Sequence, residues 1–99
     1  MVLRVVERIP PGRAMAYGAI AQVVGEHLGR GGPRTVGAVL SAYGAAVPWW
    51  RVVTASGQLP RGHEVAALRE LVAEGCPLLA DGSRVDLARA AWHPPPSLK

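Results

Sequence analysis

Residues 17–41 read YGAIAQVVGEHLGRGGPRTVGAVLS, and this stretch decides the fold. Its first half carries apolar residues at helical spacing, namely Ile20, Val23, Val24 and Leu28. The run Gly29-Arg30-Gly31-Gly32 then interrupts that helix. Pro33 suits the first turn of a second helix, because its missing N–H would have no partner there. The stretch therefore predicts two helices joined by a glycine-rich turn.

The second of these helices has an inward face and an outward face. Its inward positions are Val36, Val39 and Leu40, and its outward positions are Arg34, Thr35, Ala38 and Ser41. Small residues such as Gly37 and Ala38 allow close approach. The partner in that approach is either a DNA backbone or a neighbouring helix.

Shorter elements flank this pair of helices. An opening helix is predicted by the spacing of Val2, Val5, Val6 and Ile9, and it ends at Pro10-Pro11-Gly12. A small β-hairpin is predicted from Val52-Val53-Thr54, the turn signal Ser56-Gly57 and a return strand at Gln58-Leu59.

The last third of the chain predicts one more helix and an irregular tail. That helix ends near Gly75 and carries Val65, Leu68, Leu71 and Val72. The tail has a turn at Asp81-Gly82 and a proline run over 94–96. The whole pattern predicts one domain over residues 1–99, mostly α with a small β-hairpin, of the winged helix-turn-helix DNA-binding class.

Composition narrows the functional classes. Cys76 is the single cysteine, so the chain forms no internal disulfide, and His27, His63 and His93 are too scattered to suggest a metal site. No apolar run approaches the length of a membrane span, and the first residues lack the pattern of a signal peptide. We expect a cytoplasmic monomer with no cofactor, no metal and no membrane partner.

The charge distribution is uneven. Residues 1–62 hold seven Arg against two Glu, a net charge of +5, whereas residues 63–99 hold four basic and five acidic residues, a net charge of −1. A positive field of this kind is typical of nucleic-acid binding, although a basic surface without function has the same composition. Arg13, Arg34 and Arg51 belong to this basic part of the chain.

Five segments carry a family resemblance when read in order. They are Ile9–Gly12 followed by Ala16–Ala21, then Arg34–Val39, Pro48–Val53 and Ala73–Gly75. Together they resemble the DNA-binding domain of the O6-alkylguanine-DNA alkyltransferase family. In the transferases the fourth segment contains Pro-Cys-His-Arg-Val, and its cysteine accepts the alkyl group. Here Trp49 and Trp50 occupy the cysteine and histidine positions.

A tryptophan at the acceptor position defines the alkyltransferase-like proteins. The resemblance therefore implies a non-enzymatic DNA-damage sensor that binds O6-alkylguanine in duplex DNA without alkyl transfer. An indole offers no basic lone pair, so Trp49 cannot replace a thiolate as nucleophile. The resemblance also implies minor-groove insertion of the second helix of the pair, nucleotide flipping, and nucleotide excision repair proteins as partners.

The resemblance assigns roles to individual residues. Arg34 and Tyr17 would flip the nucleotide, with Arg34 filling the gap left in the stack. The alkylguanine pocket would consist of Pro48, Trp49, Trp50 and Arg61. DNA would contact Thr35, Gly37, Ala38, Ser41 and Ser56. Arg51 and Glu74 would support the site, either as an ion pair or with Glu74 capping local backbone.

Two other functions are weighed against this one. An alkyltransferase that uses Cys76 instead is excluded by position, because Cys76 lies a whole helix beyond the pocket. A winged-helix transcription regulator would need base-reading side chains such as Asn or Gln on the second helix of the pair. That helix offers Thr35, Gly37, Ala38 and Ser41 instead, which suits groove insertion better.

Overall fold

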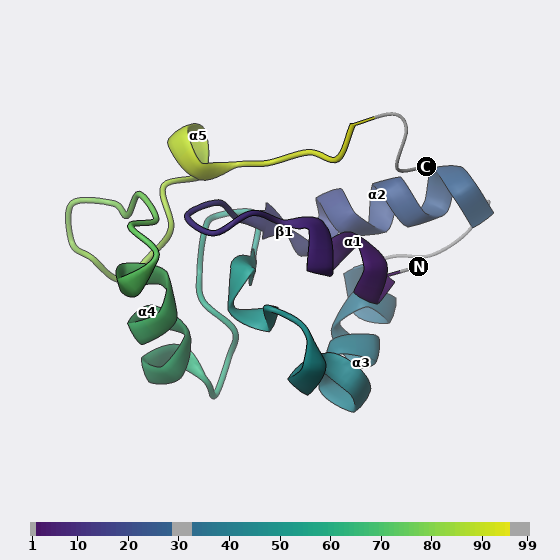
Figure 1. The fold of residues 1–99 in the computed structure, drawn as a ribbon, viewed down its shortest axis with the longest axis horizontal. Coiled ribbons are helices and arrows are strands. Elements are labelled where there is room, and N and C mark those ends of the chain that lie inside the picture. Colours follow the sequence, from purple (N-terminus) through teal and green to yellow (C-terminus); the bar gives the residue numbers. More distant parts are fainter. Residues whose placement is uncertain (1, 29–32, 96–99) are drawn as a thin grey trace.

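Three helices pack together in the computed structural model, which describes residues 2–28 and 33–95 (Figure 1). They are α1 (Val2–Arg8), α2 (Tyr17–Leu28) and α3 (Pro33–Tyr43). Their buried positions include Val5, Ile20 and Val36, at the spacing that predicted them. The outward set of α3 is exposed as expected. The glycine-rich turn at 29–32, the side chain of Leu28 and Pro96 lie outside the described residues.

The remaining elements are short. They comprise the 3-10 helices η1 (Gly44–Ala46) and η2 (Trp49–Arg51), the strands β1 (Met15–Ala16) and β2 (Val52–Val53), and the helices α4 (Glu64–Ala73) and α5 (Leu87–Ala90). A mostly helical fold with a two-stranded sheet confirms the predicted class.

The sheet differs from the expected hairpin. β2 pairs in parallel with β1, with Met15 opposite Val52 and Ala16 opposite Val53. The turn after β2 does form, since the Gly57 N–H donates to the Thr54 carbonyl at 2.9 Å. Gln58 nevertheless bridges to Arg84 and not to β2. The predicted return strand at Gln58-Leu59 was therefore wrong, because the Gln58 carbonyl accepts from the Thr54 N–H at 3.0 Å within the turn, and the strand-like pairing of Gln58 is with Arg84.

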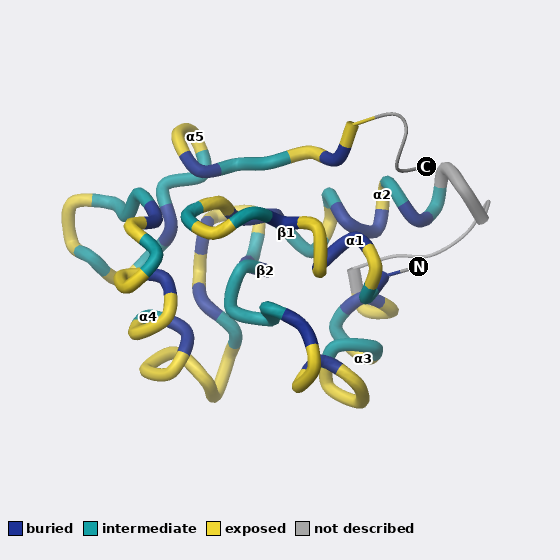
Figure 2. Tube along the Cα trace, in the orientation of Figure 1, coloured by how far each residue is buried: buried dark blue, intermediate teal, exposed yellow. Residues whose placement is uncertain are grey.

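This short sheet divides the core in two (Figure 2). Val52 packs with α1, α2 and α3 in one cluster, and the next residue, Val53, packs with α4 and the C-terminal segment in the other. Successive side chains of a strand point to opposite faces, so adjacent residues join different clusters. Both valines are fully buried, and β2 therefore holds the two halves of the molecule together.

The C-terminal segment is bonded to Arg13 and Ala14, the two residues just before β1. The Ala14 N–H donates to the Ala90 carbonyl, and the Trp92 N–H donates to the Ala14 carbonyl, both at 3.0 Å. The Arg13 guanidinium donates to the carbonyls of Ala90 and Ala91. Arg13 is thus engaged within the protein, whereas its charge had suggested a place in the DNA-binding surface.

Helix α4 turns a different face inward from the one expected. Ala67 and Leu71 are buried and Leu68 packs beside them, whereas Val65 and Val72 are 75% and 59% exposed. The i, i+3, i+7 pattern had marked the two valines as core residues. Ala67 is fully buried in the cluster that also holds Val53 and Leu71, so the inward face of α4 runs through Ala67 and Leu71.

Within the described residues, no helix is long and apolar enough to cross a membrane. The same residues contain no cluster of three side chains suited to hold a metal ion.

Candidate nucleic-acid interface

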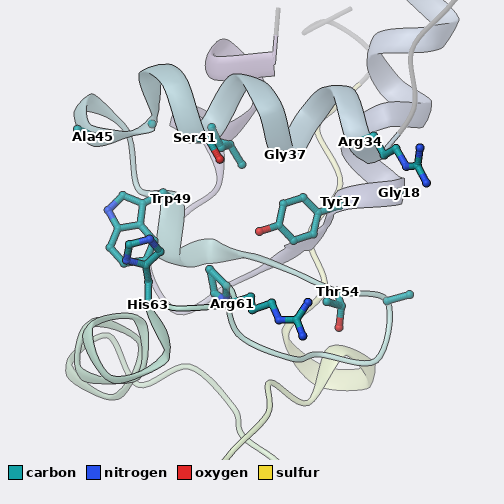
Figure 3. Close-up of a pocket in the computed structure, with 14 residues that line it drawn as sticks. Tyr17, Gly18, Arg34, Gly37, Ser41, Ala45, Trp49, Thr54, Arg61 and His63 are labelled. Carbon is teal, nitrogen blue, oxygen red and sulfur yellow. The ribbon is translucent and has the colours of Figure 1, made fainter.

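An open cavity of about 890 Å³ lies between α3 and the loop that joins β2 to α4 (Figure 3). The beginning of α2 contributes Tyr17 and Gly18, and α3 contributes four residues from Arg34 to Ser41. Trp49 of η2 and the loop residues Arg61 and His63 line the opposite side. The cavity thus brings together residues from four separate parts of the chain.

Trp49 lies at one end of this cavity with His63 against it. The two ring centroids are 5.7 Å apart with an angle of 64° between the ring planes. Trp50 meets Trp49 from another side, at 5.7 Å and 83°. Edge-to-face contacts of this kind hold an aromatic ring in one orientation, so the Trp49 ring is held in place at this end of the cavity.

Arg34 lies at the far end, and Tyr17 and Arg61 lie between (Figure 3). Burial raises the pKa of the Tyr17 hydroxyl above its usual 10.0, so this group stays a neutral donor at physiological pH. Arg34 and Arg61 are exposed and line the cavity wall. The two predicted flipping residues, Arg34 and Tyr17, therefore share one cavity with Trp49.

The outward face of α3 continues this surface. Gly37 and Ser41 line the cavity, whereas Thr35 and Ala38 are exposed beside it. A Cβ added at Gly37 would meet none of the described atoms within 4 Å. Glycine is therefore not required there for helix–helix packing, the alternative explanation of this residue. Ser56 is exposed, and its hydroxyl oxygen lies 3.1 Å from that of Thr54, which lines the cavity.

Two residues assigned to the pocket lie behind it. Pro48 and Trp50 do not line the cavity. The Trp50 indole N–H instead donates to Glu74 Oε2 at 2.9 Å, and the Arg51 guanidinium lies over the Trp50 ring, 5.4 Å from its centroid. Because this bond and the contact with Arg51 turn the Trp50 ring toward α4, Trp50 supports Trp49 from behind.

Glu74 is the centre of this supporting cluster. Arg51 forms an ion pair with Glu74 at 2.5 Å and also donates to the Ile9 carbonyl at 2.8 Å. The Gly12 N–H donates to Glu74 Oε1 at 3.3 Å. One carboxylate thus joins the loop after α1, η2 and the end of α4. The expected ion pair of Glu74 with Arg51 is present, whereas the backbone N–H that Glu74 accepts from is not local but belongs to Gly12, 62 positions away.

The balance of forces on Glu74 favours its charged form. Burial alone would raise its pKa, but hydrogen bonds from Arg51, Trp50 and Gly12, with the Arg51 charge, outweigh burial and lower it below 4.5. The carboxylate therefore stays ionised at neutral pH.

Comparison with known proteins identifies the family to which this chain belongs. Residues 1–75 match the family described as "6-O-methylguanine DNA methyltransferase, DNA binding domain". The chain belongs to this methyltransferase DNA-binding domain family. With Trp49 in place of the acceptor cysteine, it is an alkyltransferase-like member.

Relatives and solved structures of similar sequence agree with this assignment. The chain is 33% identical over 96 residues to the "DNA base-flipping protein" of Escherichia coli, covering 93% of this chain and 71% of that protein. The Vibrio parahaemolyticus protein of the same name is 30% identical, with 94% and 93% covered. S. pombe Atl1, solved "in complex with damaged DNA containing O6-carboxymethylguanine", superimposes with a TM-score of 0.75 at 27% identity, covering 94% of this chain and 92% of that chain.

In this alkyltransferase-like chain the only thiol is separate from the cavity. Cys76 is buried and packs with Ala67, Leu71 and Val85. Burial, and next the Glu74 charge, raise the pKa of its thiol above the usual 9.0. A buried thiol of raised pKa is a poor nucleophile, and Cys76 serves as a small core residue.

Several residues of the cavity were not predicted. His63, Thr54 and Leu40 line it, as do Gly44, Ala45 and Pro60. The sequence signal for His63 was a histidine two residues after Arg61, just before a helix. A second hollow of about 950 Å³ adjoins the cavity, shares Tyr17, Thr54, Pro60 and Arg61 with it, and also carries Glu64 and Asp81.

Proposed function

We propose that this protein recognises O6-alkylguanine in duplex DNA by flipping it into the cavity, without transferring the alkyl group. The observation that carries the proposal is Trp49, which stands at the acceptor position of the family and closes one end of the cavity. An indole face stacks on a flipped base and packs against an alkyl group. The same indole has no basic lone pair with which to attack that group.

The geometry suits flipping from the minor groove. The exposed residues of α3 between Arg34 and Tyr43 are the small residues Thr35, Ala38, Ser41 and Ala42, so this part of the helix can approach the DNA backbone closely. Arg34, at the N-terminal end of α3, would enter the duplex and fill the gap left by the flipped nucleotide. Tyr17, next to the path from Arg34 to Trp49, would press on the nucleotide and help it rotate.

Names of relatives support this proposal. Two similar proteins are called DNA base-flipping proteins, and Atl1 was solved with an O6-alkylated guanine. We propose that this chain, like Atl1, binds damaged DNA. We further propose that it acts as a monomer in the cytoplasm and that nucleotide excision repair proteins act on its complex. A sensor without chemistry has an effect only if another protein acts on what it binds.

A paired binding experiment tests the proposal. Two duplexes of identical sequence, one with O6-methylguanine and one with guanine, are compared by gel shift, and the lesion duplex is expected to bind more tightly. Radiolabelled methyl on the lesion should stay on the DNA. Label on Cys76, or on any residue, would show alkyl transfer and overturn the proposal. Equal affinity for both duplexes, with affinity varying instead among undamaged sequences, would favour a transcription regulator.

A further inference from the structure

His63 holds a defined position at the beginning of α4. Its N–H donates to the Pro60 carbonyl at 3.0 Å, and its carbonyl accepts from the Ala67 N–H at 2.9 Å. The backbone is therefore fixed on both sides, while the residue itself is exposed. The ring lies against Trp49 and lines the same end of the cavity (Figure 3). Any group that reaches Trp49 from the cavity also comes close to the imidazole.

The described residues of this cavity are unevenly charged. Arg34, Arg61 and His63 line it, and no Asp or Glu among the described residues does so. The adjoining hollow differs, because it contains both Glu64 and Asp81. Arg34 lies at the end far from Trp49. Among the described residues that line the cavity, the polar side chain in ring contact with Trp49 is the His63 imidazole, and none is a carboxylate that would oppose an anion there.

We infer that His63 is a specificity-determining residue, which favours O6-alkyl groups that end in a carboxylate over plain hydrocarbon groups. The inference rests on the proposed function, which places the alkyl group at Trp49. A methyl group would contact only the indole face. A carboxymethyl group would extend to the imidazole, whose N–H can donate to a carboxylate oxygen.

We expect this preference to depend on pH through His63, because the other charged or titratable groups near it do not change charge over the same range. Histidine is the side chain that ordinarily changes charge between about pH 5 and 8. Arg34 and Arg61 stay charged throughout that range. Tyr17 stays neutral, since burial raises the pKa of its hydroxyl. Glu64, the residue after His63, lines the adjoining hollow and not this cavity.

The test compares three duplexes that differ only in one base: guanine, O6-methylguanine and O6-carboxymethylguanine. Affinities are measured by fluorescence anisotropy at about pH 5.5 and about pH 8, either side of the ordinary histidine range. The measured quantity is the ratio of the carboxymethyl affinity to the methyl affinity. We expect this ratio to be about two- to fivefold higher at the lower pH, the size of a partly solvated ion pair.

Two variants and a control assign the effect. His63→Phe keeps a ring against Trp49, and its ratio of carboxymethyl affinity to methyl affinity should become low and independent of pH. His63→Gln keeps a donor without a titrating group, so its ratio should also lose its pH dependence. His93→Phe makes the same substitution at an exposed histidine that does not line the cavity, and should behave as wild type.

A ratio that still rises at low pH in His63→Phe, or that never rises in the wild type, would overturn the role of His63. A failure of the proposed function itself would give a different binding result. In that case the wild type would bind guanine as tightly as either lesion.

Discussion

Trp50 donates its indole N–H to Glu74 at 2.9 Å, and the same carboxylate pairs with Arg51. In the transferases that this chain resembles, a histidine stands at the position of Trp50 and is oriented by the matching glutamate. An indole N–H can donate but cannot accept a proton. The contact between Trp50 and Glu74 is therefore a structural support, and Trp50 cannot carry out the proton transfer that a histidine at this position would perform.

Glu74→Gln should destabilise the protein. The amide keeps the size of the side chain but leaves Arg51 without its charge partner, at a cost of about 2–3 kcal/mol at neutral pH. Because the folded-state pKa of Glu74 is lowered, its stabilisation is present above the usual 4.5 and is lost as the pH falls through the lowered value. Urea unfolding should therefore show a large difference from wild type at neutral pH that narrows in acid.

The control for this prediction is Glu70→Gln, on the exposed side of α4. It should change the unfolding free energy little at either pH. An equally large effect of both substitutions, or a Glu74→Gln effect that persists in acid, would contradict the central role of the Glu74 carboxylate.

Trp49→Ala and Trp50→Phe should separate the cavity from its support. Trp49 lines the cavity, so its removal should reduce the preference for O6-methylguanine over guanine by about 1–3 kcal/mol, as base–aromatic stacking supplies. Trp50→Phe removes the bond to Glu74 and leaves a smaller ring beside Arg51 and Trp49, and it should lower the free energy of unfolding by about 1–2 kcal/mol. Gel shifts and urea titrations on both variants check this. If Trp50→Phe lost the lesion preference and Trp49→Ala kept it, Trp50 and not Trp49 would be the residue that contacts the base.

Arg34→Ala should weaken binding to a lesion duplex strongly and binding to a lesion single strand little. Unstacking costs a few kcal/mol, which filling of the gap must recover, and a single strand has no opposite strand to replace. Arg89→Ala, an exposed arginine on α5 that does not line the cavity, serves as the control. A fluorescent base analogue beside the lesion reports extrusion. Unchanged extrusion and duplex affinity in Arg34→Ala would exclude the finger role.

Salt dependence should distinguish the free arginines from the engaged ones. With ~3–5 neutralised phosphates, the slope of log affinity against log salt should be roughly −3 to −4.5. Arg34→Ala should make the slope less negative by about 1. Arg13 donates to the carbonyls of Ala90 and Ala91, so Arg13→Ala should leave the slope unchanged and lower stability by about 1–2 kcal/mol. Equal slope changes in both variants would show that Arg13 also contacts DNA.

The helices and the exposed face of α3 were predictable, because their signal is local. Val5, Val6 and Ile9 are buried and lie within or just after one helix, so periodicity alone places them on one face. Helix α4 shows the limit of that signal. Val65 and Val72 fit a helical pattern but are exposed, because the face of α4 that packs into the core is the one with Ala67 and Leu71.

The candidate site was predicted only in part. Arg34, Tyr17, Gly37, Ser41, Arg61 and Trp49 line the cavity as residues named from the sequence. Pro48 and Trp50 lie behind it, although they adjoin Trp49 in the chain. Which of two adjacent tryptophans faces the cavity depends on the bond from Trp50 to Glu74 on the far side of η2. No pattern within residues 48–51 contains that information.

By itself, the sequence determined the helical elements, the small residues on the face of α3, and the replacement of a nucleophilic thiol by Trp49. These are properties of single residues or of neighbours within two turns of helix. Only the tertiary structure decided the pairing of β1 with β2, the contact of His63 with Trp49, and the convergence of Gly12, Trp50 and Arg51 on Glu74. Gly12 and Glu74 are 62 positions apart, so their contact depends on how whole elements pack and not on any pattern among neighbouring residues.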